Sequence, residues 1–149
     1  MNRIYGIALS LHLLPTVGFM LQGTVYLTTS EFMPYHAEAL NVHWSELSLP
    51  YQGFVIGVIR GMGAGSFTVA LALLIILLIP YRRRETWTYW AVPAIGLSFS
   101  ILTAYAAFTI DVRTPASTPW PATCGLALMY AMGGSLTLIP RLRPKEPLS

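Results

Sequence analysis

The sequence has few charged residues and almost no cysteine, and both scarcities limit what the protein can be. Only 10% of its 149 residues are charged, whereas a typical soluble domain has about 25%. Such a chain has too few charges to cover the surface of a soluble globule. The single cysteine, Cys124, excludes an intrachain disulfide and a multi-cysteine metal site.

The signatures of common enzymes are also missing from the sequence. It contains no G-x-S-x-G, no P-loop and no H-E-x-x-H. His36 and His43 share a polar stretch with Glu38 and Glu46, but their spacing matches no zinc signature. We expect these four side chains to keep the stretch in water or to anchor it at the membrane interface. The alternative is that they form a weak metal site or a proton-responsive site. We expect no metal site, no cofactor and, on balance, no enzymatic activity.

Long apolar runs are abundant. Hydrophobic residues make up 54% of the chain and gather at 4–29, 51–79, 87–110 and 120–139. Each run can cross a bilayer, whose hydrocarbon core takes about 20 helical residues. The first run is longer than a signal-peptide core and lacks an A-x-A-like cleavage site. We therefore predict an all-α fold, with one membrane domain over 1–149 and four transmembrane helices in an up-down bundle.

The basic residues predict the orientation of this bundle. With the N-terminus inside, the inner side holds nearly all of them, namely Arg3, Arg82, Arg83, Arg84, Arg141, Arg143 and Lys145. The outer side holds Arg113. This asymmetry predicts a multi-pass protein of the cell inner membrane with both termini cytoplasmic, and it argues against a nucleic-acid-binding patch. The longest outer loop is 30–50. Within this loop we predict a short helix over 34–40 that lies on the membrane surface.

The run at 51–79 carries a regular pattern of small residues. Glycines recur at every fourth position, so they share one helix face that a neighbouring helix or a lipid can approach closely: Gly53, Gly57, Gly61 and Gly65. Ala64, Thr68 and Ala72 form a second small face, which favours a central place in the bundle. We expect the glycines to pack within the bundle; the alternatives are contact with another protein, a second copy or a ligand.

Arg60 lies inside that glycine series. Counting back about 20 residues from Ile79 places Arg60 near the outer boundary of the hydrocarbon, at the depth of Asp111 and Glu31. We expect an ion pair of Arg60 with Asp111 or Glu31. The alternatives are that Arg60 binds a lipid headgroup or another anion, or extends its side chain to water.

The remaining polar groups lie deeper in the predicted helices. His12 and Gln22 share one face of the first helix, Tyr105 lies on the third helix and Tyr130 on the fourth. Such groups face the bundle interior and bond between helices. The alternative is that they line, together with Arg60, a pocket for a lipid or a quinone.

The second run also resembles the DoxX-like family of small bacterial membrane proteins. The residues that carry the resemblance are Arg60-Gly61, Gly63-Ala64-Gly65 and the apolar stretch that follows through Leu78. The resemblance implies a four-span architecture. Proteins of this type are mostly of unassigned function, and some are associated with redox or respiratory systems. No catalytic residue follows from the resemblance.

The sequence therefore predicts a non-enzymatic accessory or scaffold subunit that docks on a larger membrane complex through its helix faces. Its expected partners are membrane lipids and other membrane protein subunits or a second copy. The alternative is a lipid- or quinone-binding membrane protein with a redox or isomerase activity. A transporter comes third, because the sequence shows no inverted repeat.

Overall fold

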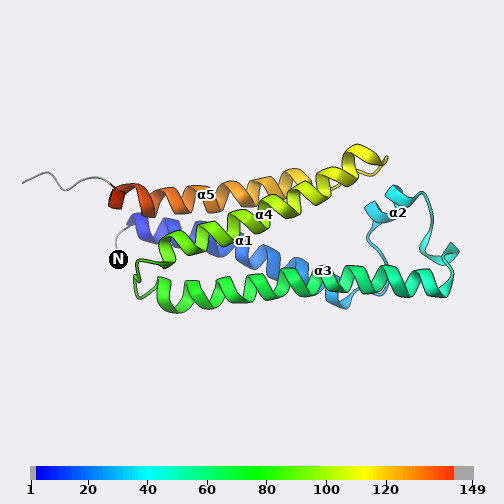
Figure 1. The fold of residues 1–149 in the computed structure, drawn as a ribbon, viewed down its shortest axis with the longest axis horizontal. Helices are drawn as coiled ribbons and strands as arrows, with labels where there is room; N and C mark the ends of the chain where they lie inside the picture. Colours follow the sequence, from blue (N-terminus) through cyan, green and yellow to red (C-terminus); the bar gives the residue numbers. More distant parts are fainter. Residues whose placement is uncertain (1–2, 143–149) are drawn as a thin grey trace, which may run out of the picture.

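The computed structural model describes residues 3–142, and this part of the chain is helical throughout, without strands. Four helices are long and apolar enough to span a membrane, which confirms the predicted all-α fold with four long apolar helices. They are α1 (Arg3–Thr28), α3 (Leu49–Ile76), α4 (Thr88–Arg113) and α5 (Trp120–Leu142), and they alternate in direction along one axis (Figure 1). The basic residues Arg143 and Lys145, predicted to follow the last helix, lie outside the described residues.

α3 continues into a π-helical turn, η2 (Leu77–Tyr81). Pro80 lies in this turn and has no N–H to donate, so the regular hydrogen-bond ladder cannot continue through it. A charged turn follows, in which Arg84 adopts the left-handed conformation with φ of 61°. The Arg84 guanidinium lies 5.2 Å from the centre of the Tyr5 ring, and the Tyr5 hydroxyl donates to the Tyr81 carbonyl. The turn is thereby tied to the start of α1.

The long connection between α1 and α3 is folded. It contains α2 (Pro34–Leu40), where a short helix was expected, and the 3₁₀ turn η1 (Trp44–Glu46). The hydroxyls of Tyr26 and Tyr35 are hydrogen-bonded, which ties α2 to α1. The Gln52 amide donates to the carbonyls of Trp44 and Leu47 at 3.0 and 3.1 Å. These bonds hold the connection against the end of the bundle.

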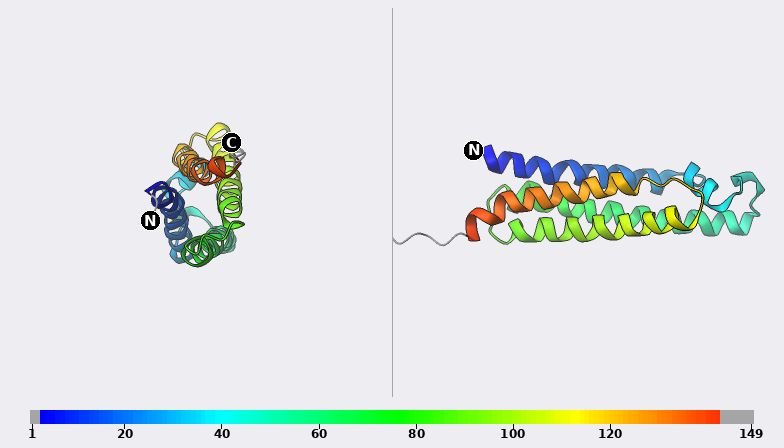
Figure 2. Two further views of the ribbon diagram at one scale, coloured as in Figure 1. Left: turned by 90° about the vertical axis from the view of Figure 1, so that its left-hand side faces the viewer. Right: turned by 90° about the horizontal axis from the view of Figure 1, so that it is seen from above.

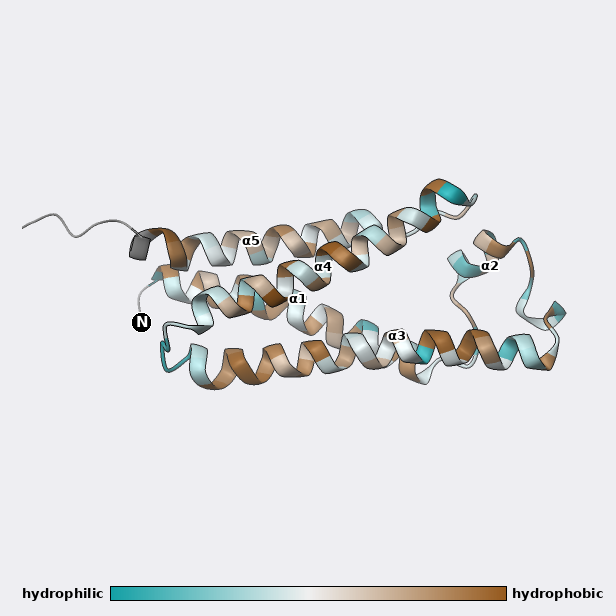
Figure 3. Cartoon of the chain, viewed as in Figure 1, coloured by the Kyte–Doolittle hydropathy of each residue, from teal (hydrophilic) through white to brown (hydrophobic). Residues whose placement is uncertain are grey.

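The ends of the bundle differ in charge. The start of α1, the arginine turn after η2 and the end of α5 lie at one end, which we call the arginine end (Figure 3). The connection containing α2 lies at the other, the α2 end, together with the turn between α4 and α5. The first and last described residues therefore lie at the same end, whereas the side of the membrane that this end faces stays a prediction.

α1 is the central helix. It packs along α3 on one side and α5 on the other, and α4 packs along α5 (Figure 2). α3 and α4 contact each other little, although they are consecutive, and they diverge toward the α2 end (Figure 1). The prediction that the second membrane helix is central was wrong, because α3 packs chiefly on α1 and its second small face is exposed, at Ala64, Thr68 and Ala72.

Two glycines that face each other bring α1 and α3 together. A Cβ added to Gly23 would lie 2.6 Å from the backbone nitrogen of Phe67 and 2.9 Å from the carbonyl oxygen of Gly63. A Cβ added to Gly63 would lie 2.8 Å from the Cβ of Tyr26. Neither site has room for a side chain, so this contact depends on glycine at both positions.

This contact yields a prediction about stability. Gly23→Ala should lower the free energy of unfolding by about 1–3 kcal/mol, the usual cost of overpacking, because the methyl group would meet backbone atoms. Thermal or SDS-induced unfolding of the purified protein in mild detergent measures this. The matched control is Gly57→Ala, whose Cβ would meet nothing within 4 Å. Equal stability of the two variants would contradict the role given to Gly23.

Candidate functional site

His12 lies at the centre of the packed core. Its side chain is 0% exposed, as expected for an inward-facing polar group of the first helix. The imidazole lies directly over Gly133 of α5, where an added Cβ would be 2.7 Å from the ring atom Cε1. The rings of Tyr81 and Tyr130 surround it, with centroids 5.7 and 5.8 Å from that of His12. The contact between α1 and α5 is built on this ring.

A short hydrogen-bonded chain runs beside the imidazole. The Thr16 hydroxyl donates to the His12 carbonyl at 2.7 Å and lies 2.8 Å from the Tyr130 hydroxyl. The Tyr130 ring occupies the space that a side chain at Gly96 would need, since an added Cβ there would be 2.4 Å from ring carbons. Tyr130 therefore joins α1, α4 and α5.

The two ring nitrogens of His12, Nδ1 and Nε2, have no hydrogen-bond partner in the described part of the chain. An unpaired buried polar atom usually costs about 1–3 kcal/mol. No ligand reaches the ring in this conformation, because the side chain is fully enclosed. The geometry shows a packed polar core, not an open binding site.

The predicted lipid or quinone pocket is not assembled from the residues expected to line it. Tyr130 and His12 are in contact, as expected. Gln22 is half-buried and makes no hydrogen bond to the described residues. Tyr105 is 69% exposed and lines an outer groove of about 600 Å³ between α4 and α5. Small residues, among them Gly96 and Ser100, occupy the inner face of α4 instead.

The expected ion pair of Arg60 with Asp111 or Glu31 is not formed. Arg60 and Glu31 are both exposed, and the structure gives neither an ionic partner among residues 3–142. Asp111 instead accepts from the Thr118 backbone N–H at 2.8 Å and from the Trp120 indole at 3.3 Å. These bonds close the tight turn between α4 and α5, so nearby backbone and indole donors satisfy the carboxylate.

The four glycines of α3, which we call the glycine face, point away from the bundle. A Cβ added to Gly53, Gly57, Gly61 or Gly65 would meet nothing within 4 Å. At 3.6 residues per turn, this face lies opposite the buried positions of α3, namely Ile59, Gly63, Ser66, Ala70 and Leu73. The expectation that the glycine face packs within the bundle was wrong, since α3 packs on α1 through its opposite face, at Gly63.

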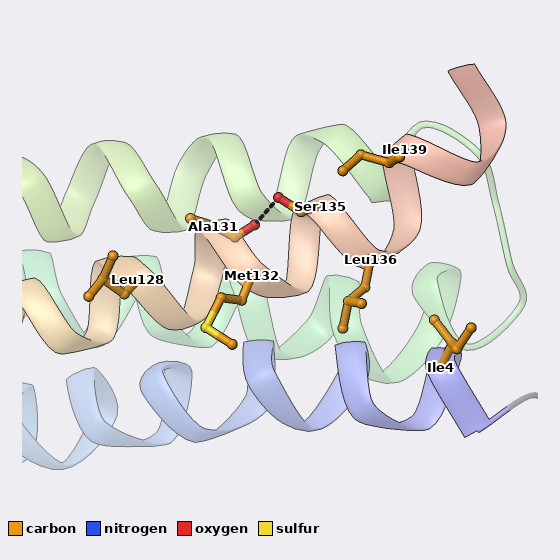
Figure 4. A pocket seen from close by; sticks show the side chains of 7 residues that line it. All are labelled: Ile4, Leu128, Ala131, Met132, Ser135, Leu136 and Ile139. Carbon is orange, nitrogen blue, oxygen red and sulfur yellow. Dashed lines mark hydrogen bonds between the residues drawn. The ribbon is translucent and has the colours of Figure 1, made fainter. Parts of the chain in front are cut away.

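A shallow groove between α1 and α5 has little chemistry to offer. Its volume is about 460 Å³, and its walls are aliphatic except for Ser135 and the thioether of Met132 (Figure 4). The Ser135 hydroxyl donates to the Ala131 carbonyl at 2.8 Å. Lipid chains can fill such a groove, but it presents no group that would select one ligand.

The histidines of the α2 connection take part in local capping. His36 Nδ1 accepts from the Met33 backbone N–H at 3.2 Å, and the His43 backbone N–H donates to Glu46 at 3.1 Å. Within the described residues, no three His, Cys, Asp or Glu side chains gather to hold a metal ion.

No protein-family model, no curated protein and no solved structure matches this chain. The resemblance to DoxX-like proteins therefore stays a prediction.

Several residues that organise the core were not predicted from the sequence. Tyr81 precedes the charged turn and Tyr89 follows it, as membrane-interface residues do, yet their side chains are 0% and 1% exposed. Gly133 and Gly134 are isolated from the regular glycine series, but added Cβ atoms would meet His12 and Pro93 within 3 Å. The pair Gly133-Gly134, one turn beyond Tyr130, was a signal that these positions face a close neighbour.

The unpaired nitrogens of His12 yield a second prediction. His12→Leu should leave the free energy of unfolding unchanged or raise it by about 1–3 kcal/mol, because an apolar side chain removes both unpaired nitrogens. SDS-induced unfolding in mild detergent, followed by circular dichroism, measures this. Gly133→Ala should destabilise, because its methyl group would meet the imidazole. If His12→Leu instead lowers the free energy of unfolding by about 1 kcal/mol or more, the contribution of one hydrogen bond, the imidazole has a polar partner.

A third prediction concerns the pH dependence of α2. Burial lowers the pKa of His36, so the folded chain favours the neutral ring that accepts the Met33 N–H. That stabilisation is complete above the unfolded-state pKa of about 6.5 and is lost as the pH falls toward the lower folded value. Proteolysis near α2 should therefore accelerate below about pH 6.5. His36→Leu should abolish this dependence; a persistent dependence would assign it to another group.

Proposed function

We propose that the protein is a non-enzymatic accessory subunit of a membrane complex, which docks on a transmembrane helix of another protein through the glycine face of α3. The observation that carries this proposal is the outward direction of the face. Each glycine in a helix costs about 1 kcal/mol relative to alanine. Packing within the chain does not offset this cost, because an added Cβ at these positions meets nothing within 4 Å. A closely packed partner helix would offset it.

Charge supports a partner that differs from this chain. Arg60 is exposed beside the glycine face and has no ionic partner in the part of the chain that the structure describes. A charge at the edge of the hydrocarbon is favoured by an opposite charge nearby. α3 carries no acidic residue, so a second copy of α3 would not supply one. We infer that the partner helix carries an aspartate or glutamate near the level of Arg60.

The membrane setting belongs to the same proposal. We infer insertion into the cell inner membrane, with the arginine end and both termini in the cytoplasm. The support is the apolar composition of the four long helices and the concentration of arginine in the turn after η2.

Cross-linking from single positions tests the proposed docking. A photoreactive residue at Gly57 or Gly61 should cross-link, in native membranes, to another membrane protein. The same residue at Gly125 of α5, where an added Cβ also meets nothing within 4 Å, should not. Gly57→Ile should abolish the association, and Arg60→Gln should weaken it by about 10-fold or more, as expected for a charged hydrogen bond of about 1.5–3 kcal/mol.

Two outcomes would contradict the proposal. Cross-links from Gly57 to a second copy would replace the heterologous partner with a homo-oligomer. Cross-links from Gly57 to lipid alone, together with a stable monomer in mild detergent, would show that the glycine face has no protein partner.

A further inference from the structure

A pocket lies at the α2 end of the bundle, where α3 and α4 stand apart and α2 lies between them (Figure 1). We call it the rim pocket. Its volume is about 380 Å³, within the range of about 300–1,000 Å³ of small-molecule sites. Three elements supply its walls, chiefly His36 and Leu40 of α2, Phe54, Val58 and Met62 of α3, and Ile110 of α4.

The rim pocket lies at the edge of the hydrocarbon when the four helices span a bilayer. α3 and η2 together have 33 residues and α4 has 26, so α3 extends seven residues further, or about 10 Å. Counted about 20 residues from the arginine end, the boundary falls near Arg60 on α3 and Phe108 on α4. The walls of the pocket therefore lie at this boundary and just beyond it, at the level of the lipid ester groups.

The walls of the rim pocket need an apolar cover at this level. Phe54 is 71% exposed and Val58 and Met62 are each 48% exposed. Deep in the bilayer, lipid chains would surround such side chains at no cost. Beyond the boundary they face water, and each Å² of apolar surface left uncovered costs about 25 cal/mol. An apolar occupant is therefore favoured.

The position of the rim pocket favours one kind of occupant. α3 and α4 contact each other little, so a hydrocarbon chain can enter between them sideways from the bilayer. A lipid of the adjacent leaflet has such a chain, and its ester and phosphate groups lie at the level of the pocket walls. We therefore consider a lipid chain as the occupant.

One polar group on the pocket wall is available to an occupant. His36 Nδ1 accepts the Met33 N–H, so the neutral ring carries its proton on Nε2. Nε2 makes no hydrogen bond to the residues that the structure describes. Thr114, the other polar residue of the wall, already donates to the Ile110 carbonyl at 2.9 Å. The free N–H calls for an acceptor such as a carbonyl oxygen.

A positive charge lies next to the same wall. Arg113 directly precedes Thr114, is exposed, and has no ionic partner among residues 3–142. Arginine binds phosphate through paired hydrogen bonds. We propose that the rim pocket binds one acyl chain of a glycerophospholipid from the adjacent leaflet. In this site His36 Nε2–H donates to the ester carbonyl and Arg113 binds the phosphate.

Photolabelling of the purified protein tests this site without any partner protein, so its outcome is independent of the proposed docking. The protein is reconstituted in phosphatidylethanolamine vesicles that contain phosphatidylglycerol with a diazirine near the carbonyl end of one chain. Labelled residues are then mapped by mass spectrometry. Labelling of the α3 and α4 walls should exceed that of the outer face of α1 around Val25, which lies at a similar depth, by about fivefold, the equivalent of about 1 kcal/mol.

Substitutions make the test specific. Val58→Trp should remove the excess labelling by filling the pocket, whereas Val25→Trp, at a similarly exposed valine of 50%, should not. His36→Phe should reduce the excess about 2- to 10-fold, the worth of one hydrogen bond, and Arg113→Gln should reduce it as well. Circular dichroism and gel filtration identify any variant that fails to fold. If Val58→Trp does not fold, the test is made with His36→Phe instead.

Three results would overturn the proposal. The first is labelling of the pocket walls no stronger than that of the α1 face. The second is unchanged labelling in folded Val58→Trp. The third is displacement of the label by an isoprenoid quinone but not by unlabelled phosphatidylglycerol, which would assign the pocket to a quinone.

Discussion

The close contact between α1 and α3 at Gly23 and Gly63 determines how the rest of the bundle is arranged. Because the two backbones meet there without side chains between them, the contact favours the rotation of α3 that places Gly63 against Gly23. In that rotation Ile59 and Leu73 enter the core, and the glycine face turns away from it. The surface that we assign to a partner is thus a consequence of a contact on the opposite side of the same helix.

A second set of close contacts places α4. The His12 ring over Gly133 fixes α5 against α1, and the Tyr130 ring at Gly96 fixes α4 against α5. α4 is therefore held through α5, and its contact with α3 is limited. The two helices remain close near the arginine turn, which joins them covalently, and stand apart at the α2 end. The rim pocket occupies that separation, so its existence follows from the order in which the helices are packed.

Much of the fold could be predicted from residue types and periodicity. The four apolar segments, the short helix at 34–40 and the inward face of the first helix, which carries His12, all followed from local patterns. The candidate site was predicted less well. A four-residue repeat shows that glycines share a helix face, but it does not show which neighbouring helix that face contacts. Asp111 likewise accepts hydrogen bonds from Thr118 and Trp120 in its own turn. It therefore does not need Arg60 as a partner.

The sequence by itself determined that this protein is a chain of four apolar helices with short polar connections, because hydrophobic length and periodicity are local properties. It also showed that Arg60 and the glycine face lie on one helix. Only the tertiary structure decided which way that helix is turned, which helix is central, and where α3 and α4 separate. These features depend on distant pairs such as Gly23 with Gly63 and His12 with Gly133, whose fit no local pattern records.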